Sequence, residues 1–513
     1  MRIGVDVGGT NTDAVLIDAN GLVVDRTKTP TTADVSTGIR NALGQLLRNR
    51  PATPISAAML GTTQCTNAVV ERRGLRRVSV LRLGAPATTA VPPFTDWPAD
   101  LRAQVEGPVA IIAGGHEFTG KELSALDVEA VKRTADDAAR AGLSIAVVGV
   151  FSAVNPDHEQ RVAEVCARVA GPDHPVSLSR EIGSIGFLER ENATILNAAL
   201  ADIARVATTS FEEAVHAACG PARCYLTQND GTLMALDYAV RYPSLILASG
   251  PANSMRGAAY LAGVSEGLVI DVGGTTTDIG ILVRGFPREA PFAVEIGGVR
   301  TNFRMPDVVS LPLGGGTIVR QKGNQVRLGP DSVGFRLTDE ALAFGGTVST
   351  FTDAAIVLGR ATLGDHSPAM SESTAAAAYA MAMDLVERGL ERMRPSSAPI
   401  RTIAVGGGSV LLPDCMDDGL PLLRPSDFQV ANAIGAAISE VSGGVDRILA
   451  IGSQNSQQLR AEVEHEAVAN AVAAGADPTA VRIVVREEIP IAYLSGNAIR
   501  VRVKAAGPMA ISE

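Results

Sequence analysis

The chain has 513 residues, of which 46% are hydrophobic, and it contains a single tryptophan and 52 glycines. This length exceeds what one hydrophobic core usually serves, so we expect two large domains and an appendage. The composition indicates a packed α/β protein and excludes a disordered chain. A formal net charge of −10 and a pI near 5.3 argue against nucleic acid as a partner. The one basic run, residues 72–77, is expected to be a solvated loop.

The cysteines and the hydropathy of the chain indicate in which cellular compartment the protein is expected. The five cysteines are scattered, and no two have the two-residue spacing of a zinc knuckle. No apolar run approaches the ~20 residues of a membrane-spanning helix, and no charged and apolar leader opens the chain. We therefore expect a protein of the reducing cytoplasm that has no membrane partner.

The first half of the chain reads as strands followed by an α/β alternation. Strands are expected at 3–7, 12–18, 21–27, 57–61, 78–83, 109–112, 144–150 and 176–179. Helices are expected at 35–49, from about 64, at 124–141, 156–169, within 184–218 and at 251–262. Residues 84–108, around Trp97, are expected to form a connecting loop, and Asp230-Gly231 marks a hairpin turn.

The second half begins near Gly267. It is expected to contain a glycine-rich segment at 313–317, an alanine-rich helix at 371–393, a strand at 403–405 and a small-residue helix at 432–437. Small side chains allow close helix packing, which suits a point where two domains pivot, although such a helix can also simply be well packed. After about 445 the pattern predicts a helix at 457–474, a strand at 481–485 and a hairpin at 489–504 around 495–497.

An eight-residue segment occurs twice. Residues 6–13 read Asp-Val-Gly-Gly-Thr-Asn-Thr-Asp and residues 271–278 read Asp-Val-Gly-Gly-Thr-Thr-Thr-Asp, so seven of the eight positions are identical. Each copy lies between two short apolar strands, which places its Gly-Gly pair in a turn. Glycine permits positive φ and lets backbone N–H groups approach an anion, and the threonines add hydroxyl donors. The repeat therefore predicts two phosphate-binding hairpins.

Individual residues of the repeat have expected roles. The candidates for the phosphates are Gly8, Gly9, Thr10, Asn11, Thr12, Gly273, Gly274, Thr275 and Thr276. Asp6 and Asp271 end their strands, where a carboxylate can hold Mg²⁺ or orient a water. Asp13 and Asp278 either orient the hairpin hydroxyls or cap the strand that follows.

A third turn, Gly406-Gly407-Gly408, follows the strand at 403–405, and such an edge suits a flat adenosine. Thr62, Thr63 and Asn67, near a helix start, are candidates for binding substrate or for a routine helix cap. Cys65 has no base near it in sequence, so a nucleophilic role is not expected. His116, His158 and His366 lack metal-ligand spacing and are expected at the surface or in loops.

Two such hairpins, a Gly-Gly-Gly strand end and a small-residue helix, in this order, resemble the actin, sugar kinase and heat-shock chaperone ATPase superfamily. Closer resemblance points to the hydantoinase A and oxoprolinase family. Besides the two hairpins, it rests on Gly61-Thr62-Thr63, Glu189-Arg190, Ser249-Gly250-Pro251-Ala252 and Ala431-Asn432-Ala433-Ile434-Gly435.

The resemblance implies a fold and a domain division. The fold is α/β, with two ribonuclease H-like (actin-like ATPase) domains flanking a nucleotide cleft and a small α+β C-terminal appendage. The first ATPase domain would span 1–265, the second 266–445 and the appendage 446–513.

The resemblance also implies ATP and Mg²⁺ as cofactors and a small-molecule substrate whose carbonyl oxygen is phosphorylated. We expect an ATP-dependent amidohydrolase subunit that opens a small cyclic amide such as a hydantoin, lactam or 5-oxoproline, with a separately encoded partner subunit. A small-molecule kinase or carboxylase component, and a nucleotide-gated regulator without turnover, remain alternatives. A homo-oligomer is left open. The chain departs from the family pattern at Val309, where a histidine is usual.

Overall fold

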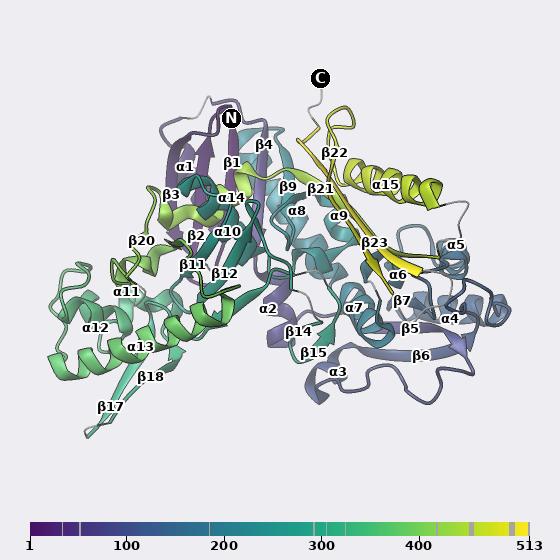
Figure 1. Cartoon of the computed structure of the whole chain (residues 1–513), viewed down its shortest axis with the longest axis horizontal. Coiled ribbons are helices and arrows are strands. Elements are labelled where there is room, and N and C mark those ends of the chain that lie inside the picture. Colours follow the sequence, from purple (N-terminus) through teal and green to yellow (C-terminus); the bar gives the residue numbers. More distant parts are fainter. Residues whose placement is uncertain are drawn as a thin grey trace.

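The computed structural model describes residues 1–32, 34–50, 53–183, 185–290, 293–303, 305–323, 325–416, 419–450, 456–491 and 498–510. Within these residues the strands form three sheets and two small hairpins, with helices packed between and around the sheets (Figure 1). The strand and helix alternation expected for an α/β protein is confirmed.

The largest sheet has nine strands. In spatial order they are β22 (Arg482–Pro490), β23 (Ala498–Gly507), β21 (Val441–Ala450), β10 (Leu233–Ala235), β9 (Arg223–Thr227), β4 (Ala57–Thr62), β1 (Arg2–Val7), β2 (Asn11–Ile17) and β3 (Val23–Pro30). The strands β1, β2 and β3 form an antiparallel meander, whereas β4 runs parallel to β1. The hairpin expected at Asp230-Gly231 is confirmed, because β9 and β10 pair antiparallel on either side of it.

The second sheet repeats this start. Its path is β13 (Phe286–Pro287), β12 (Thr277–Val283), β11 (Gly267–Val272), β19 (Thr402–Val405) and β20 (Leu422–Leu423), with β16 (Val308–Leu311) also paired to β12. The strands β11 and β12 pair antiparallel as β1 and β2 do, and β19 lies parallel to β11 as β4 lies parallel to β1. The sequence repeat is therefore also a repeat of strand topology.

A smaller sheet is fully parallel. Its order is β6 (Glu106–Ala113), β5 (Val78–Ala85), β7 (Ser144–Gly149) and β8 (Val176–Leu178). Residues 84–108 were expected to be a loop, but α3 (Ala99–Val105) and the start of β6 occupy the end of that range. Leu101 and Val105 are buried in the main core, and this packing gives the segment a helical turn that its composition does not indicate.

The remaining elements pack around these sheets. The other helices are α1 (Val35–Leu47), α2 (Gln64–Glu71), α4 (Val128–Arg140), α5 (Asp157–Ala170), α6 (Ser179–Ile182), α7 (Phe187–Ala199), α8 (Ala201–Cys219), α9 (Leu236–Arg241), α10 (Ser249–Ala262), α11 (Leu337–Glu340), α12 (Phe351–Val357), α13 (Glu372–Met393), α14 (Ala431–Ile438) and α15 (Ser456–Ala473). The 3-10 turns are Pro243–Ile246, Gly334–Arg336, Leu342–Phe344, Gly407–Leu411 and Phe428–Val430. The hairpins are β14 (Val294–Ile296) with β15 (Val299–Thr301), and β17 (Thr317–Lys322) with β18 (Gln325–Ser332), which extends away from the body (Figure 1).

Two helices are exchanged between the halves of the chain. Helix α10, from the first half, packs against the second sheet, where Met255 and Ala258 join a cluster with Val269. Helix α14, from the second half, packs against the first sheet, where Ala433 and Ile434 join a cluster with the strand β2. The division of the chain at 265 and 445 stays a prediction, and helix packing crosses it.

The C-terminal segment also joins the first sheet. The strand β21 lies beside β10, and β22 and β23 pair antiparallel beyond it, so β21, α15, β22 and β23 form a βαββ unit. The expected hairpin is present between β22 and β23, although its turn at 492–497 lies outside the described residues. In Figure 1 the strands β22 and β23, drawn in yellow, extend the sheet whose earlier strands are purple and teal.

The exchanged helices meet through glycines. A Cβ at Gly257 of α10 would lie 1.9 Å from the carbonyl oxygen of Ala431, and one at Gly435 of α14 would lie 1.9 Å from that of Asn253. Real side chains do not approach a backbone oxygen so closely. The close helix packing expected from the small residues is therefore present, and it is a contact of backbone against backbone.

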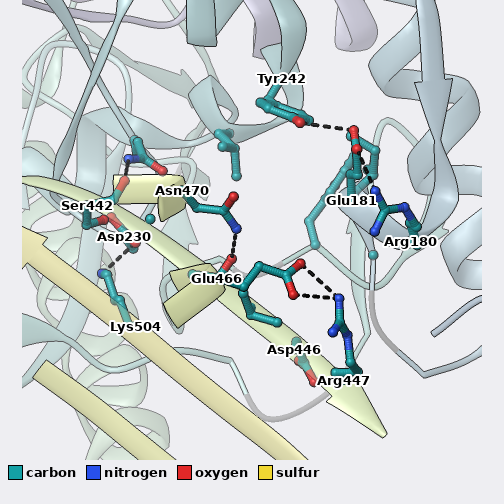
Figure 2. Close-up of a pocket in the computed structure, with 18 of the residues that line it drawn as sticks. Arg180, Glu181, Asp230, Tyr242, Ser442, Asp446, Arg447, Glu466, Asn470 and Lys504 are labelled. Atoms are coloured by element: carbon teal, nitrogen blue, oxygen red, sulfur yellow. Dashed lines mark hydrogen bonds and ion pairs between the residues drawn. The ribbon is translucent and has the colours of Figure 1, made fainter. Parts of the chain in front are cut away.

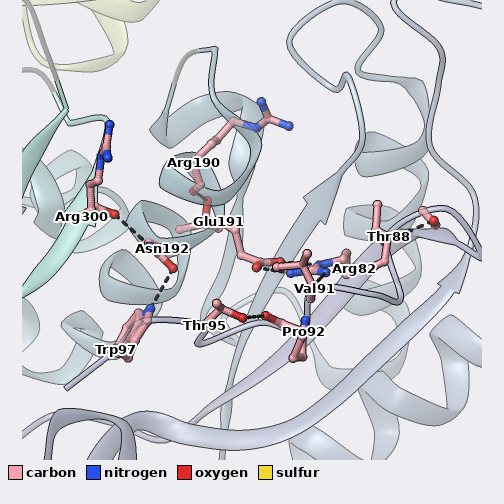
Figure 3. Close-up of polar contacts among 12 residues, drawn as sticks. Arg82, Thr88, Val91, Pro92, Thr95, Trp97, Arg190, Glu191, Asn192 and Arg300 are labelled. Atoms are coloured by element: carbon pink, nitrogen blue, oxygen red, sulfur yellow. Dashed lines mark hydrogen bonds and ion pairs between the residues drawn. The ribbon is translucent and has the colours of Figure 1, made fainter. Parts of the chain in front are cut away.

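A buried ion pair joins the parallel sheet to α7. Arg82 of β5 and Glu191 are almost fully buried, and Arg82 Nε donates to Glu191 Oε1 over 2.8 Å (Figure 3). Arg82 also donates to the carbonyl oxygens of Thr88 and Val91. Burial raises the pKa of Glu191, and the Arg82 guanidinium opposes that rise. The Arg82 guanidinium thus joins the segment after β5, through Thr88 and Val91, to helix α7.

Gly435→Ala should lower the free energy of unfolding by about 1–3 kcal/mol, because the added methyl group overpacks a backbone contact. Gly44→Ala, on the exposed face of α1 where a Cβ would meet nothing within 4 Å, is the matched control and should be neutral or stabilising by up to about 1 kcal/mol. Chemical denaturation measures both. Equal stability of the two variants would contradict the assigned helix contact.

Glu191→Leu should destabilise the fold by about 3–5 kcal/mol, because it leaves the buried Arg82 guanidinium without its carboxylate. The double variant Arg82→Met with Glu191→Leu removes both charges and should lose less than the single variant. Thermal and urea unfolding of the wild type and the variants measure this. A double variant that is less stable than Glu191→Leu would show that the packing of these side chains, rather than their charge pairing, dominates.

Candidate functional site

The two repeated hairpins line one cleft of about 360 Å³ between the first and second sheets. The cleft is lined by Asp6, Gly8, Gly9, Thr10, Asn11, Asp13, Lys28, Thr63, Gly250, Pro251, Asp271, Gly273, Gly274, Thr275, Thr276, Asp278, Gly315, Leu337, Phe344, Thr352, Leu363, Gly406, Gly407, Gly408, Leu411, Gln429 and Asn432. Tertiary folding thus brings together segments more than 400 residues apart in sequence, such as Asp6 and Asn432.

The hairpin turns approach each other directly. Each turn is closed by a backbone hydrogen bond, from Gly8 N to Asn11 O over 3.0 Å and from Gly273 N to Thr276 O over 2.9 Å. A Cβ at Gly274 would lie 2.5 Å from the hydroxyl oxygen of Thr10, so the second turn rests against the first. Any larger residue at 274 would therefore force the Thr10 side chain to shift.

Several groups in the turns have unused hydrogen-bonding capacity. Among the described residues, the backbone amides of Gly9, Thr10, Gly274 and Thr275 donate to no acceptor. A Cβ at Gly9 would meet no atom within 4 Å, so the backbone there is open to the cleft. Amides of this kind at a glycine turn can hold phosphate oxygens.

The Gly406-Gly407-Gly408 turn forms a third wall. The strand β19 lies beside β11 with Val405 opposite Asp271, so the turn begins at the level of that carboxylate. Gly406 has a φ of +83°, and a Cβ there would lie 2.2 Å from Asp271 Oδ1. Gly407 is open, with no atom within 4 Å of a Cβ position. The apolar side chains of Leu337, Phe344, Leu363 and Leu411 also line the cleft. That combination suits a flat heterocycle.

Asp6 and Asp271 are linked through side chains of the exchanged helices. Asn432 Nδ2 of α14 donates to Asp6 Oδ2 over 3.3 Å, and its Oδ1 lies 2.5 Å from the Ser254 hydroxyl of α10. The Ser254 hydroxyl is also within hydrogen-bond distance of Asp271. Helix packing therefore sets how the two carboxylates are placed.

The carboxyl groups of the cleft have raised pKa values. Burial, followed by the charges of Asp13 and Asp271, raises the pKa of Asp6 to about 7. Burial raises the pKa of Asp271 and raises that of Asp278 to about 6. The cleft therefore gathers carboxyl groups whose ionised form is disfavoured by burial and would be stabilised by a bound cation.

Lys28 is a cleft residue that the sequence analysis missed. It lies on β3 directly opposite Asp13 on β2, and its Nζ is 2.6 Å from Asp13 Oδ1. Burial raises the pKa of Asp13, and Lys28 opposes the rise. The cross-strand register of the β2–β3 pair is the signal that could have found it. Among the described residues that line the cleft, Lys28 is the one lysine or arginine.

The residues present fit ATP and a partly hydrated Mg²⁺. Open amides and Lys28 suit phosphates, and the Gly406–Gly408 turn suits a base. No group of three or more His, Cys, Asp or Glu side chains arranged to hold a metal occurs in the part of the chain that the structure describes. Mg²⁺ in nucleotide sites is commonly held by one or two carboxylates, phosphates and waters, so Asp6 and Asp271 remain the predicted ligands.

Three predicted site residues do not line the cleft. Thr12 is fully buried, with its hydroxyl 3.5 Å from that of Thr31. Thr62 is buried at the end of β4, and its hydroxyl accepts a hydrogen bond from Gln64 N. Asn67 is exposed and donates to the Thr63 hydroxyl over 3.3 Å. Thr63 itself reaches the cleft. The substrate and nucleotide roles of these residues stay predictions.

The structure also shows how far the remaining candidate residues, Cys65 and the three histidines, are buried. Burial raises the pKa of the Cys65 thiol to about 12, so it stays protonated at neutral pH. His116 and His158 are buried, with ring centroids 4.4 Å apart. His116 lies in the loop after β6, as expected, but His158 lies in α5, so the surface or loop position expected for it is wrong. His366 is exposed in a loop, as expected. Gly115 N donates to His158 Nδ1, which gives that ring a structural task.

Val309 lies on β16 opposite Ile279 and packs against the core of the second sheet. The position at which the family pattern has a histidine therefore has an apolar contact here.

Two family models match the chain. The model of the hydantoinase/oxoprolinase N-terminal region matches residues 2–170, and the hydantoinase/oxoprolinase model matches residues 190–394. The chain belongs to the hydantoinase/oxoprolinase family. Both matched regions contribute residues to the cleft, since the first contains the Asp6 hairpin and the second contains the Asp271 hairpin.

Curated relatives share part of their length with this chain. Caprolactamase subunit alpha of Pseudomonas jessenii is 31% identical over 396 residues, which is 70% of this chain and 54% of the relative. The acetophenone carboxylase gamma subunit of Aromatoleum aromaticum is 28% identical over 394 residues, 70% of this chain and 53% of the relative. The chain thus spans about half the length of these relatives.

The crystal structure of the ATP-dependent caprolactamase from Pseudomonas jessenii has the same fold. It superposes with a TM-score of 0.76 at 20% identity, covering 99% of this chain and 88% of that chain. This likeness shows that the two chains share a fold, and it agrees with the α/β architecture expected from the sequence. None of the described helices has the length and apolar character needed to cross a membrane.

The raised pKa of Asp6 predicts a pH-dependent cost to stability. An Asp with an unfolded-state pKa near 3.8 and a folded-state pKa of about 7 favours the unfolded state as pH rises through that window. The free energy of unfolding of the wild type should therefore fall relative to that of Asp6→Asn between pH 6 and pH 8, by about 1.4 kcal/mol. Urea denaturation in EDTA without nucleotide measures it. Asp384→Asn, at an exposed position on α13, is the control. A stability difference between the wild type and Asp6→Asn that does not change with pH would contradict the raised pKa of Asp6.

Proposed function

We propose that this chain is an ATP-dependent amidohydrolase subunit that activates a small cyclic amide by phosphorylation of its carbonyl oxygen. The observation that carries the proposal is the meeting of the two phosphate-type turns at one cleft with the acidic pair Asp6 and Asp271. Membership of the hydantoinase/oxoprolinase family and the caprolactamase relative favour a cyclic amide such as a hydantoin, lactam or 5-oxoproline.

The proposed reaction uses the protein mainly for positioning. The amide carbonyl oxygen attacks the terminal phosphorus of ATP, and the bond from that phosphorus to the ADP oxygen breaks. Water then adds to the activated carbon, and the ring C–N bond breaks as the nitrogen takes up a proton, which leaves an acyl phosphate. A second water hydrolyses the acyl phosphate to a carboxylate and inorganic phosphate. The open amides of Gly9, Thr10, Gly274 and Thr275, together with Lys28, would hold the phosphate oxygens. Asp6 and Asp271 would hold Mg²⁺ and orient water.

A carboxylase component is the second candidate. The acetophenone carboxylase gamma subunit matches the same 70% share of this chain as caprolactamase subunit alpha does. Activation of a carbonyl oxygen or of bicarbonate by ATP would use the same turns and carboxylates. The two candidates differ in the molecule that accepts the phosphoryl group.

A partner subunit is part of the proposal. Both relatives carry subunit names, and the chain spans about half of their length. We infer that groups for handling the activated substrate come from outside the described residues, since Val309 occupies the position of the family histidine with an apolar contact.

The test is Mg-ATP hydrolysis by the purified chain with a panel of hydantoins, lactams and 5-oxoproline, and separately with ketones plus bicarbonate. A cyclic amide should stimulate release of ADP and phosphate, and Asp271→Asn should reduce the stimulated rate by about 100-fold or more, because it weakens the charge stabilisation of phosphoryl transfer. Asp384→Asn on α13 should retain the wild-type rate.

The other outcomes separate the candidates. Stimulation only by a ketone with bicarbonate would support the carboxylase component and contradict the amidohydrolase. Tight ATP binding with no stimulation by any of these compounds would favour a nucleotide-gated regulator. An Asp271→Asn variant with wild-type turnover would contradict the assigned cleft.

A further inference from the structure

A second cavity of about 200 Å³ lies apart from the nucleotide cleft, and the two share no lining residue (Figure 2). It lies where the parallel sheet meets the nine-stranded sheet and the C-terminal unit. Figure 2 shows Tyr242, Glu181 and Arg180 on one side, facing Glu466, Asn470 and Arg447 across the opening.

One wall is the carboxyl edge of the parallel sheet. Ser152, Ala153 and Pro156 follow β7, and Arg180–Gly183 follow β8. In open α/β sheets, small molecules bind at the carboxyl ends of parallel strands. The opposite wall is built from the β9–β10 turn at 228–230, from residues 442–447 of β21 and from Lys504 of β23.

The carboxylates of this cavity are already neutralised. Each of them contacts a cation, in the pairs Glu181 with Arg241, Asp230 with Lys504, Asp446 with Arg500 and Glu466 with Arg447. Glu181 also accepts from the Tyr242 hydroxyl over 2.9 Å. The acids of the lining therefore have little remaining attraction for a cation.

Donors, in contrast, remain available. Arg180 Nε has no partner among the described residues, and its Nη2 lies 3.3 Å from Glu181 Oε1. Asn229 is 2% exposed, and its Nδ2 makes no hydrogen bond to any described group. The Tyr238 hydroxyl has no hydrogen-bond partner in the described part of the chain. Burial raises the pKa of Tyr238 to about 12, so it keeps its proton as a donor at neutral pH.

One acceptor is also unused. Asn302 Oδ1 is buried without a hydrogen bond within the described ranges, while its Nδ2 donates to Ile185 O over 3.1 Å. A cationic donor, two neutral donors and an acceptor thus line a cavity that is smaller than most sites for drug-sized ligands.

We propose that this cavity is a second binding site, for a small carboxylate that also carries an N–H group. Arg180 would pair with the carboxylate, Asn229 and Tyr238 would donate to its oxygens, and Asn302 would accept from the N–H group. The site is independent of the reaction at the nucleotide cleft and would remain if that reaction were assigned differently.

The test is isothermal titration of the full chain with matched carboxylate and amide probes: acetate with acetamide, glutarate with glutaramide, and 5-oxoproline with its neutral amide. The carboxylates should bind, with 5-oxoproline tightest because it also offers an N–H group, and each amide should bind at least about tenfold more weakly, because a charge-assisted contact is lost. Arg180→Gln should weaken 5-oxoproline binding by about tenfold or more, and Tyr238→Phe by about fivefold.

Two controls locate the site. Arg133→Gln, an exposed position on α4, should leave 5-oxoproline binding unchanged, and Asp6→Asn in the nucleotide cleft should leave the part of the binding that depends on Arg180 unchanged. Saturation with a non-hydrolysable ATP analogue should also leave it unchanged.

Loss of binding in Asp6→Asn but not in Arg180→Gln or Tyr238→Phe would place the ligand in the nucleotide cleft and overturn the proposal. Equal binding of acid and amide, or no binding of any carboxylate, would overturn it as well. If Arg180→Gln fails to fold, Tyr238→Phe decides alone.

Discussion

The contact between α10 and α14 is the constraint on which the cleft depends. Each helix belongs by sequence to one half of the chain and packs on the sheet of the other, and their backbones touch where Gly257 and Gly435 leave room. Ser254 and Asn432 extend from these helices to Asp271 and Asp6. Because this one helix contact joins both sheets and both carboxylates, a change in helix spacing would also change the distance across the cleft.

The repeated topology explains why the two hairpins face each other. In each half an antiparallel hairpin is flanked by a parallel strand that ends beside its first aspartate, with Asp6 opposite Gly61 and Asp271 opposite Val405. The residues that follow Gly61 and Val405, namely Thr62-Thr63 and Gly406-Gly407-Gly408, therefore occupy equivalent places. In the first half of the chain this position carries the threonine hydroxyl groups, whereas in the second half it is glycine backbone without side chains. This difference gives a nearly symmetric scaffold an asymmetric site.

Both candidate sites contain polar groups whose burial lowers the stability of the fold. In the cleft, Asp6, Asp271 and Asp278 are held where burial raises their pKa values, and burial raises that of Asp13 against the opposition of Lys28. In the second cavity the lining acids are paired and donors are left unsatisfied. The first arrangement suits a cation and phosphates and the second suits an anion, so the two cavities differ in the ligand chemistry they can recognise. Unpaired buried groups are expected at sites that bind ligands, because a ligand supplies the missing partner.

The amino-acid sequence by itself determined the α/β alternation, the two glycine turns, the small-residue helix and the carboxylates at the strand ends. These features depend on local periodicity and on backbone conformations that few residues adopt. Only the tertiary structure decided that α10 and α14 are exchanged, that β21–β23 extend the first sheet, and that His116 and His158 are buried. It also decided that Thr12 is turned away from the cleft and that Lys28 enters it. Strand neighbours and helix contacts between distant segments are selected by the burial of complementary surfaces, and a local pattern contains no record of which distant surface it will meet.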